Sequence, residues 1–186
     1  MVYLILTLIA LALFIALALF IVYNAVAIHF FGVPESLSNT YYLYEAKHKG
    51  LGWVFTIFMW ALALLLLPAW ITTSVNIGSW MQYFSFLSFI AAAAIAFVGT
   101  APKFHEDAEG KIHVISASIC AATAILWDFV ICWHIWYVFL IALAIVISVC
   151  AFTKTFKECK TYWLEMMAFV PTFAVLITEE IIQLIH

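Results

Sequence analysis

Six long apolar runs divide the chain, and short polar segments separate them. Each run supplies roughly the 20 residues that an α-helix needs to cross a bilayer at about 1.5 Å per residue. The predicted spans cover residues 2–27, 53–71, 81–98, 112–129, 136–152 and 162–182. Together they predict an all-α fold: a polytopic transmembrane helical bundle of six spans that forms a single transmembrane domain over residues 1–186.

The boundary between the fourth and fifth spans carries no turn signal, because residues 112–153 contain neither glycine nor proline. One unbroken helix over this stretch would extend for about 63 Å, roughly twice the thickness of the hydrocarbon. We therefore predict a tight hairpin at residues 128–134. Four aromatic residues lie in or beside it: Trp127, Trp133, Trp136 and Tyr137. Amphipathic rings of this kind collect where a turn leaves the membrane.

Composition places the chain in lipid: 68% of its residues are hydrophobic and only 9% are charged. A soluble domain of this length has too little interior to bury so much apolar surface. The net charge of −3 and the absence of a basic stripe predict no nucleic-acid partner. The predicted partners are membrane lipids, and oligomerisation stays open.

All basic residues are lysines, and they occur in only three of the gaps between spans. They are Lys47 and Lys49 in the first gap, Lys103 and Lys111 in the third, and Lys154, Lys157 and Lys160 in the fifth. Because lysines beside a span are retained in the cytoplasm, we expect these gaps to be cytoplasmic and both termini to be non-cytoplasmic. The predicted location is the cell inner (plasma) membrane. No basic residue precedes the first span, and its apolar stretch is longer than the apolar region of about 7–15 residues in a signal peptide, so we expect a retained helix.

Small residues recur every fourth position on the third and fourth spans. They are Ser88, Ala92 and Ala96, followed by Ser116, Cys120 and Ala124. Residues four apart share one helix face, and small side chains let two helices approach closely in lipid. The third and fourth spans are therefore predicted to pack together.

Polar residues gather at the predicted cytoplasmic face, in the first loop and at the start of the last span. The candidate ligand-binding residues are Glu35, Ser36, Ser38, Asn39, Tyr41, Tyr42 and Glu165. If they converge at the level of the lipid headgroups, they would bind or sense a lipid or a small ligand. A structural alternative stays open, because Ser38 or Asn39 could cap a short helix from Thr40 to about Lys49 that ends at Gly50.

A second hypothesis is a metal-dependent intramembrane hydrolase that acts on lipid. Its candidate ligands are His29, His105, His113, Glu106 and Asp107, which offer the imidazole and carboxylate groups that zinc accepts. The spacing from His105 to His113 matches no established zinc signature, and no nucleotide-binding or hydrolase motif occurs. We therefore predict no cofactor and assign no catalytic residue, with zinc kept as the alternative.

A third hypothesis, a small proton-coupled transporter, would use acidic residues near the other face: Asp128, Glu179 and Glu180. Acidic groups inside a span are functional candidates by default. These three lie close to predicted helix ends, where we expect them to contact water. The chain also shows no internal repeat of the kind that many transporters have.

The first loop carries a recognisable pattern, Gly32-Val33-Pro34-Glu35-Ser36-Leu37-Ser38-Asn39-Thr40-Tyr41-Tyr42, followed by Gly52-Trp53 and Pro68. Together with residues 110–113 it resembles a family of uncharacterised six-span bacterial integral membrane proteins. That resemblance implies a fold and a membrane location but no activity. The chain departs from the alkaline ceramidase and adiponectin-receptor superfamily, because its last span lacks that family's paired His-x-x-x-His.

Overall fold

The computed structural model describes residues 2–77 and 79–185, and over this part of the chain the fold is all-α. Seven α-helices are present there: α1 (Val2–Phe31), α2 (Thr40–Lys47), α3 (Trp53–Asn76), α4 (Phe86–Thr100), α5 (Asp107–Ile131), α6 (Trp136–Thr153) and α7 (Lys160–Ile185). Two short 3-10 helices, η1 (Ser79–Phe84) and η2 (Trp133–Ile135), complete the described elements.

Six of the helical segments are long and apolar enough to cross a membrane, which confirms the predicted number of spans. The third predicted span begins as the 3-10 helix η1 and continues as α4. The fourth begins at Asp107 rather than at residue 112, because Asp107 and Glu109 in its first turn interact favourably with the helix dipole. The hairpin expected at residues 128–134 is confirmed, since α5 ends at Ile131 and η2 forms the turn into α6.

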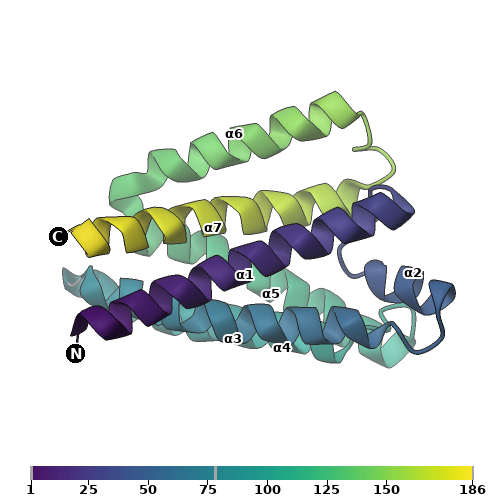
Figure 1. Cartoon of the computed structure of the whole chain (residues 1–186), viewed down its shortest axis with the longest axis horizontal. Coiled ribbons are helices and arrows are strands. Elements are labelled where there is room, and N and C mark those ends of the chain that lie inside the picture. The colour runs from purple at the N-terminus through teal and green to yellow at the C-terminus, as the bar shows by residue number, and fades with distance from the viewer. Residues whose placement is uncertain (1, 78, 186) are drawn as a thin grey trace.

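The helices pack mainly between sequence neighbours, with α7 joining the two halves of the bundle. Helices α3, α4 and α5 pack in that order, α1 packs against α3, and α6 packs against α7. Helix α7 also contacts α1, α3 and α5. Figure 1 shows the start of α1 and the end of α7 at one end of the bundle, and α2 at the opposite end.

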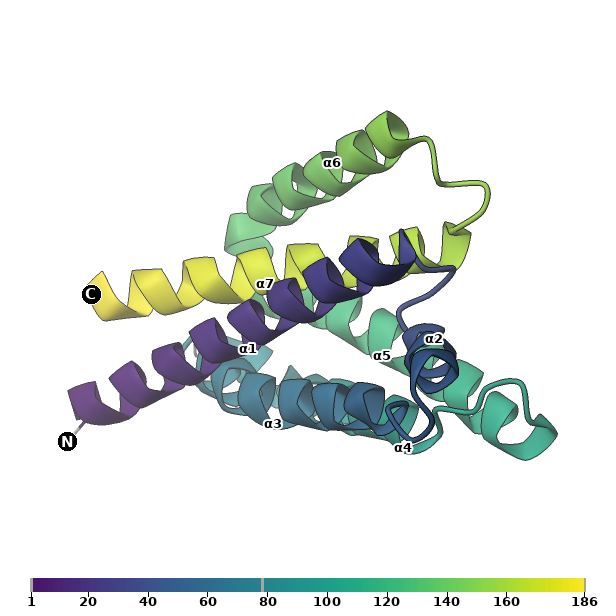
Figure 2. The ribbon, with the colours of Figure 1, turned by 45° about the vertical axis from the view of Figure 1, so that its right-hand side comes forward.

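The lysine-bearing segments share that opposite end, which we call the lysine end. It contains α2, the connection from α4 to α5 and the connection from α6 to α7 (Figure 2). This arrangement agrees with an even number of membrane crossings. The membrane side that each end faces stays a prediction from the lysine distribution.

The predicted packing of the third and fourth spans is confirmed by extensive contact between α4 and α5. Ser88 and Ala92 of α4 and Ser116 and Cys120 of α5 are buried. Helix α4 also lies close to α3, because a Cβ atom added at Gly99 would lie 2.7 Å from the Cβ of Met59. Small residues on both faces of α4 therefore allow it to pack tightly between α3 and α5.

Candidate functional site

The loop between α1 and α2 folds over the lysine end and is tied to the first turns of α7. Gly32 begins the loop with a φ of +75°, a left-handed conformation that glycine adopts without strain. The backbone N–H of Leu37 donates a hydrogen bond of 2.6 Å to Oε2 of Glu165. The N–H of Tyr162 donates to the carbonyl of Glu35 at 2.9 Å. Two predicted ligand-binding residues, Glu35 and Glu165, are thereby brought to the same place.

Ser38 joins the same loop to α5 through His113. Its Oγ atom lies 2.7 Å from Nε2 of His113, while Nδ1 of the imidazole lies 2.8 Å from the carbonyl oxygen of Ala101. A carbonyl oxygen can only accept, so the proton of the neutral imidazole is on Nδ1, and Nε2 accepts from the serine hydroxyl. Ser38 and His113 are both buried, at 3% and 5% exposure.

An open pocket of about 460 Å³, which we call the vestibule, is lined by residues of the loop, α5 and the start of α7. Its lining comprises Glu35, Ser36, Ser38, Phe104, His113, Val114, Ala117, Ser118, Ala121, Thr161, Leu164 and Glu165. Four of the predicted ligand-binding residues line it, and so does His113 from the predicted metal set. No lysine is among the lining residues, so the acidic groups there are the exposed carboxylate of Glu35 and the less exposed carboxyl group of Glu165.

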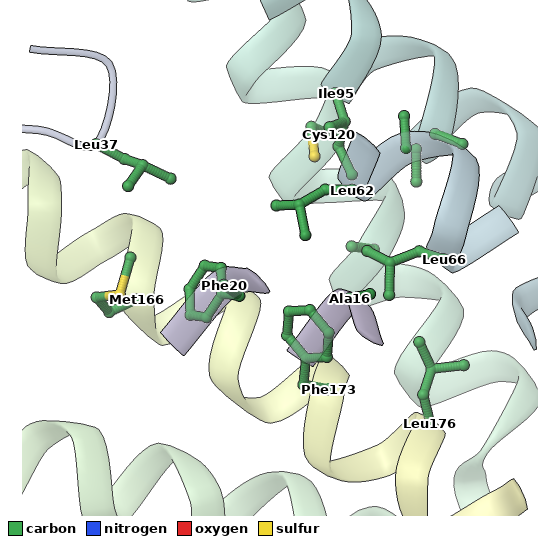
Figure 3. Packing of buried hydrophobic residues seen from close by; sticks show 14 of the residues in the cluster. Ala16, Phe20, Leu37, Leu62, Leu66, Ile95, Cys120, Met166, Phe173 and Leu176 are labelled. Atoms are coloured by element: carbon green, nitrogen blue, oxygen red, sulfur yellow. The ribbon is translucent and has the colours of Figure 1, made fainter. Parts of the chain in front are cut away.

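A second, narrow space of about 60 Å³, the interior cavity, extends between α3, α4, α5 and α7. Its walls are almost entirely apolar, and Figure 3 shows Leu37, Leu66, Cys120, Phe173 and Leu176 around the interior from four segments of the chain. The interior cavity and the vestibule share four lining residues: Ser38, Ala117, Ala121 and Glu165. The vestibule, whose lining mixes polar and apolar side chains, and the apolar cavity therefore lie next to each other along these four residues.

Three predicted ligand-binding residues, Asn39, Tyr41 and Tyr42, line neither space. Asn39 precedes α2 in a helical conformation and makes no side-chain cap. The hydroxyl of Tyr42 accepts a hydrogen bond of 3.1 Å from the backbone N–H of His105. Tyr42 therefore ties α2 to the connection between α4 and α5. The predicted capping by Ser38 or Asn39 is wrong, because the Ser38 hydroxyl bonds to His113 instead.

The structure divides the five predicted metal ligands among three places. His29 is at the end of α1 beside Phe30, while His105, Glu106 and Asp107 line a shallow surface pocket at the start of α5. Both ring nitrogens of His113 are engaged by protein groups. Over residues 2–77 and 79–185, no group of three or more histidine, cysteine, aspartate or glutamate side chains is placed to hold a metal ion. The zinc site stays a prediction.

The acidic residues of the other half of the bundle are buried, and the expectation that they contact water is wrong. Asp128, Glu179 and Glu180 are each 2% exposed. Oδ2 of Asp128 lies 2.7 Å from Oγ1 of Thr172, and Oε1 of Glu179 lies 2.7 Å from Nε2 of His134. Oδ1 of Asp128 and both carboxyl oxygens of Glu180 have no hydrogen-bond partner among the described residues. Packing of α5 against α7 removes them from water although each lies near a helix end.

The carboxylate of Glu45 in α2 holds the turn that leads into α3, and we therefore expect the order of this turn to depend on pH. Its carboxylate accepts from the backbone N–H groups of Gly50 at 2.8 Å and Gly52 at 3.0 Å, and these bonds lower the pKa of Glu45 below its usual 4.5. A carboxylate with a depressed folded-state pKa stabilises the fold above its unfolded-state pKa, and the effect is lost as the pH falls through the folded-state value.

We expect residues 48–53 to lose local order as the pH falls below about 4.5 and further toward the depressed pKa of Glu45. Hydrogen exchange, corrected for the intrinsic pH dependence of exchange, should show weaker protection of Gly50 and Gly52 over this range. A Glu45→Ala variant should show the weaker protection already at neutral pH. Equal protection in the variant and the parent at neutral pH would contradict this role of Glu45.

Comparisons with protein-family models, with curated proteins and with solved structures found no match to this chain. The resemblance of its first loop to a family of six-span bacterial proteins stays a prediction. Functional conclusions therefore depend on the geometry of the vestibule, the interior cavity and the buried carboxyl groups.

Proposed function

We propose that this multi-pass membrane protein binds a single-chain amphiphile from the cytoplasmic leaflet, with the polar head in the vestibule and the apolar chain in the interior cavity. One observation carries the proposal: the two spaces share the wall formed by Ser38, Ala117, Ala121 and Glu165. A pocket that contains carboxyl and hydroxyl groups, next to one that is almost entirely apolar, fits a molecule with a polar head and an apolar chain. The cytoplasmic side follows from the lysine distribution.

The charge of the vestibule favours a head with hydrogen-bond donors. Two carboxyl groups, from Glu35 and Glu165, and the hydroxyls of Ser36 and Thr161 line it, without a lysine. A phosphate head would face the exposed carboxylate of Glu35 with no lysine in the lining to balance it, and such like-charge repulsion is unfavourable. A hydroxylated or amino head would instead donate to the carboxylate oxygens. The supported ligand class is therefore a neutral or cationic amphiphile.

The shape of the interior cavity favours one chain. Its volume of about 60 Å³ is small, and its lining along α7 extends from Glu165 to Leu176. That length corresponds to about 16 Å of helix rise. Since one water molecule takes up about 30 Å³ of liquid, a space of this size holds only the first few methylene groups of a chain. A single acyl or similar hydrocarbon chain would therefore enter along α7 as the side chains that line the cavity move apart.

Blocking the shared wall is expected to weaken this binding. Ala121 lines both spaces, so Ala121→Trp should weaken binding of a radiolabelled monoacylglycerol to protein in nanodiscs by at least about tenfold, which corresponds to about 1.4 kcal/mol. The adjacent Ala122 is exposed on the outer face of α5, and Ala122→Trp is the matched control with unchanged binding. Equal affinity of the two variants would overturn the proposal.

The buried carboxyl groups support proton binding as a second candidate function. The hydroxyl of Thr172 lies within hydrogen-bond distance of both Asp128 and the carbonyl of Ala168, but it has one proton to donate. Both hydrogen bonds form at once if Asp128 is protonated. Its carboxyl group then donates to Oγ1 of Thr172, and the threonine hydroxyl donates its own proton to the carbonyl oxygen of Ala168. An unpaired carboxylate inside a bilayer is also costly, so neutral acid is the favoured form.

Infrared spectroscopy tests this candidate directly. In bilayers at neutral pH, the wild-type protein should show a carbonyl band of a protonated carboxyl group, and Asp128→Asn should reduce that band. Asp107 at the exposed start of α5 provides the control, because Asp107→Asn should leave the band unchanged. A wild-type spectrum without any protonated-carboxyl band would contradict the assignment.

A further inference from the structure

Ser38 and His113 have the geometry of a nucleophile and its general base. Oγ of Ser38 lies 2.7 Å from Nε2 of His113, within the reach that proton transfer requires. The carbonyl of Ala101 accepts from Nδ1 at 2.8 Å, which fixes the tautomer with its lone pair toward the serine. A third group that orients the base completes the pattern seen in nucleophilic hydrolases.

The position of Ser38 relates this pair to the ligand class above. Ser38 is one of the four residues that line both the vestibule and the interior cavity. In an acyl ester, the ester carbonyl joins the apolar chain to the polar head. An amphiphile bound with its chain in the cavity and its head in the vestibule therefore brings that carbonyl to the wall that contains Ser38.

We propose that Ser38 is the nucleophile of an acyl-transfer reaction on a single-chain acyl ester, with His113 as the general base. This inference rests on the proposed binding function and assigns its substrate class. Both residues are nearly inaccessible from bulk solvent, at 3% and 5% exposure, so a substrate would reach Ser38 from the vestibule or the interior cavity that it lines.

The reaction balances with water as the only co-reactant. Oγ of Ser38 bonds to the ester carbon as its proton moves to Nε2 of His113. The bond from that carbon to the alcohol oxygen then breaks, and the alcohol leaves with the proton from Nε2. Water from the open vestibule attacks the acyl-serine and gives a proton to His113. Ser38 departs with that proton, and a fatty acid is released.

In this reaction the hydroxyl of Ser36 would be the donor to the oxyanion that forms during both steps. Ser36 lines the vestibule two residues before Ser38, and its oxygen accepts the N–H of Asn39 at 3.0 Å. Its own proton is therefore available to a third group. Glu165 has a different role, because Oε2 accepts from Leu37 and holds the loop in place.

A fluorophosphonate probe with one alkyl chain tests the inference on the full chain in nanodiscs. Mass spectrometry should locate the adduct on Ser38, and His113→Gln should lower the labelling rate by about 100-fold. Ser148 is exposed on α6, outside both spaces, and donates to the carbonyl of Ala144. Ser148→Ala should therefore label at the parent rate.

The outcomes separate this inference from the binding proposal. If the wild-type protein binds monoacylglycerol but acquires no adduct at Ser38, Ser38 only anchors the loop, and the catalytic inference is wrong while binding stands. If neither binding nor labelling occurs, both proposals fall. Because the decisive observation is made on the wild-type chain, the result does not depend on the folding of a Ser38 variant.

Discussion

Replacement of Trp127 by alanine is expected to lower the free energy of unfolding by about 3 kcal/mol, the largest single effect on stability that we predict. The indole is fully buried at 0% exposure, and its N–H donates to Oγ of Ser74 at 2.8 Å. Its ring lies 6.3 Å from that of Trp70. Because lipid is as apolar as the core, the loss comes mainly from the cavity and the missing hydrogen bond.

Two variants separate these contributions in unfolding experiments in mixed micelles. Trp127→Phe retains most of the volume but removes the donor, so it should be destabilised by about 1 kcal/mol. Trp133 is 58% exposed near the same turn, and Trp133→Ala should change the stability by less than about 0.5 kcal/mol. An equal effect of Trp127→Ala and Trp133→Ala would show that α5 is not packed as described.

Replacement of Glu165 by leucine is expected to have the largest effect on ligand binding. The N–H of the buried Leu37 loses its acceptor, which costs about 1–3 kcal/mol and releases the loop that carries Ser36 and Ser38. Glu165 also lines both the vestibule and the interior cavity. Monoacylglycerol affinity in nanodiscs should therefore fall by at least about tenfold.

A conservative variant and a remote variant control this experiment. Glu165→Gln keeps an acceptor for Leu37 and should retain a stability within about 1 kcal/mol of the parent. Glu158 is exposed in the connection before α7, so Glu158→Leu removes one carboxylate from the lysine end without touching the site. If Glu158→Leu lowers affinity as much as Glu165→Leu, general electrostatics rather than the site would explain the loss.

The spans could be predicted from the sequence because the length of an apolar run directly reflects the thickness of a bilayer. The small residues on α4 and α5 similarly predicted which helices pack, since close approach requires small side chains at helical spacing. The predicted helix ends were less accurate than the predicted number of spans. The favourable interaction of Asp107 and Glu109 with the helix dipole extends α5 beyond its apolar run.

The site could be predicted only in part. The first loop and Glu165 were expected to converge because the topology places them at one end, and the hydrogen bond between Leu37 and Glu165 agrees with this. The pairing of Ser38 with His113 joins residues 75 positions apart. No local pattern predicts such a contact, because it depends on how the loop folds over the ends of the helices.

The expectation that Asp128, Glu179 and Glu180 contact water was wrong, because it judged the burial of a side chain from its distance to a helix end. Burial depends instead on the helix face, and Glu179 lies on the face of α7 that also carries Glu165 and Thr172 at seven-residue intervals. That regular spacing of polar residues along a span was the available signal. It indicates one polar stripe turned toward the rest of the bundle rather than toward lipid.

The most direct test of the proposed binding mode is photo-crosslinking with a monoacylglycerol that carries a diazirine at the end of its chain. The proposal predicts adducts on residues deep in the interior cavity, such as Leu66, Phe173 and Leu176, and their loss in Ala121→Trp. Adducts confined to lipid-facing residues such as Leu8 and Ile145, and unchanged in that variant, would contradict it.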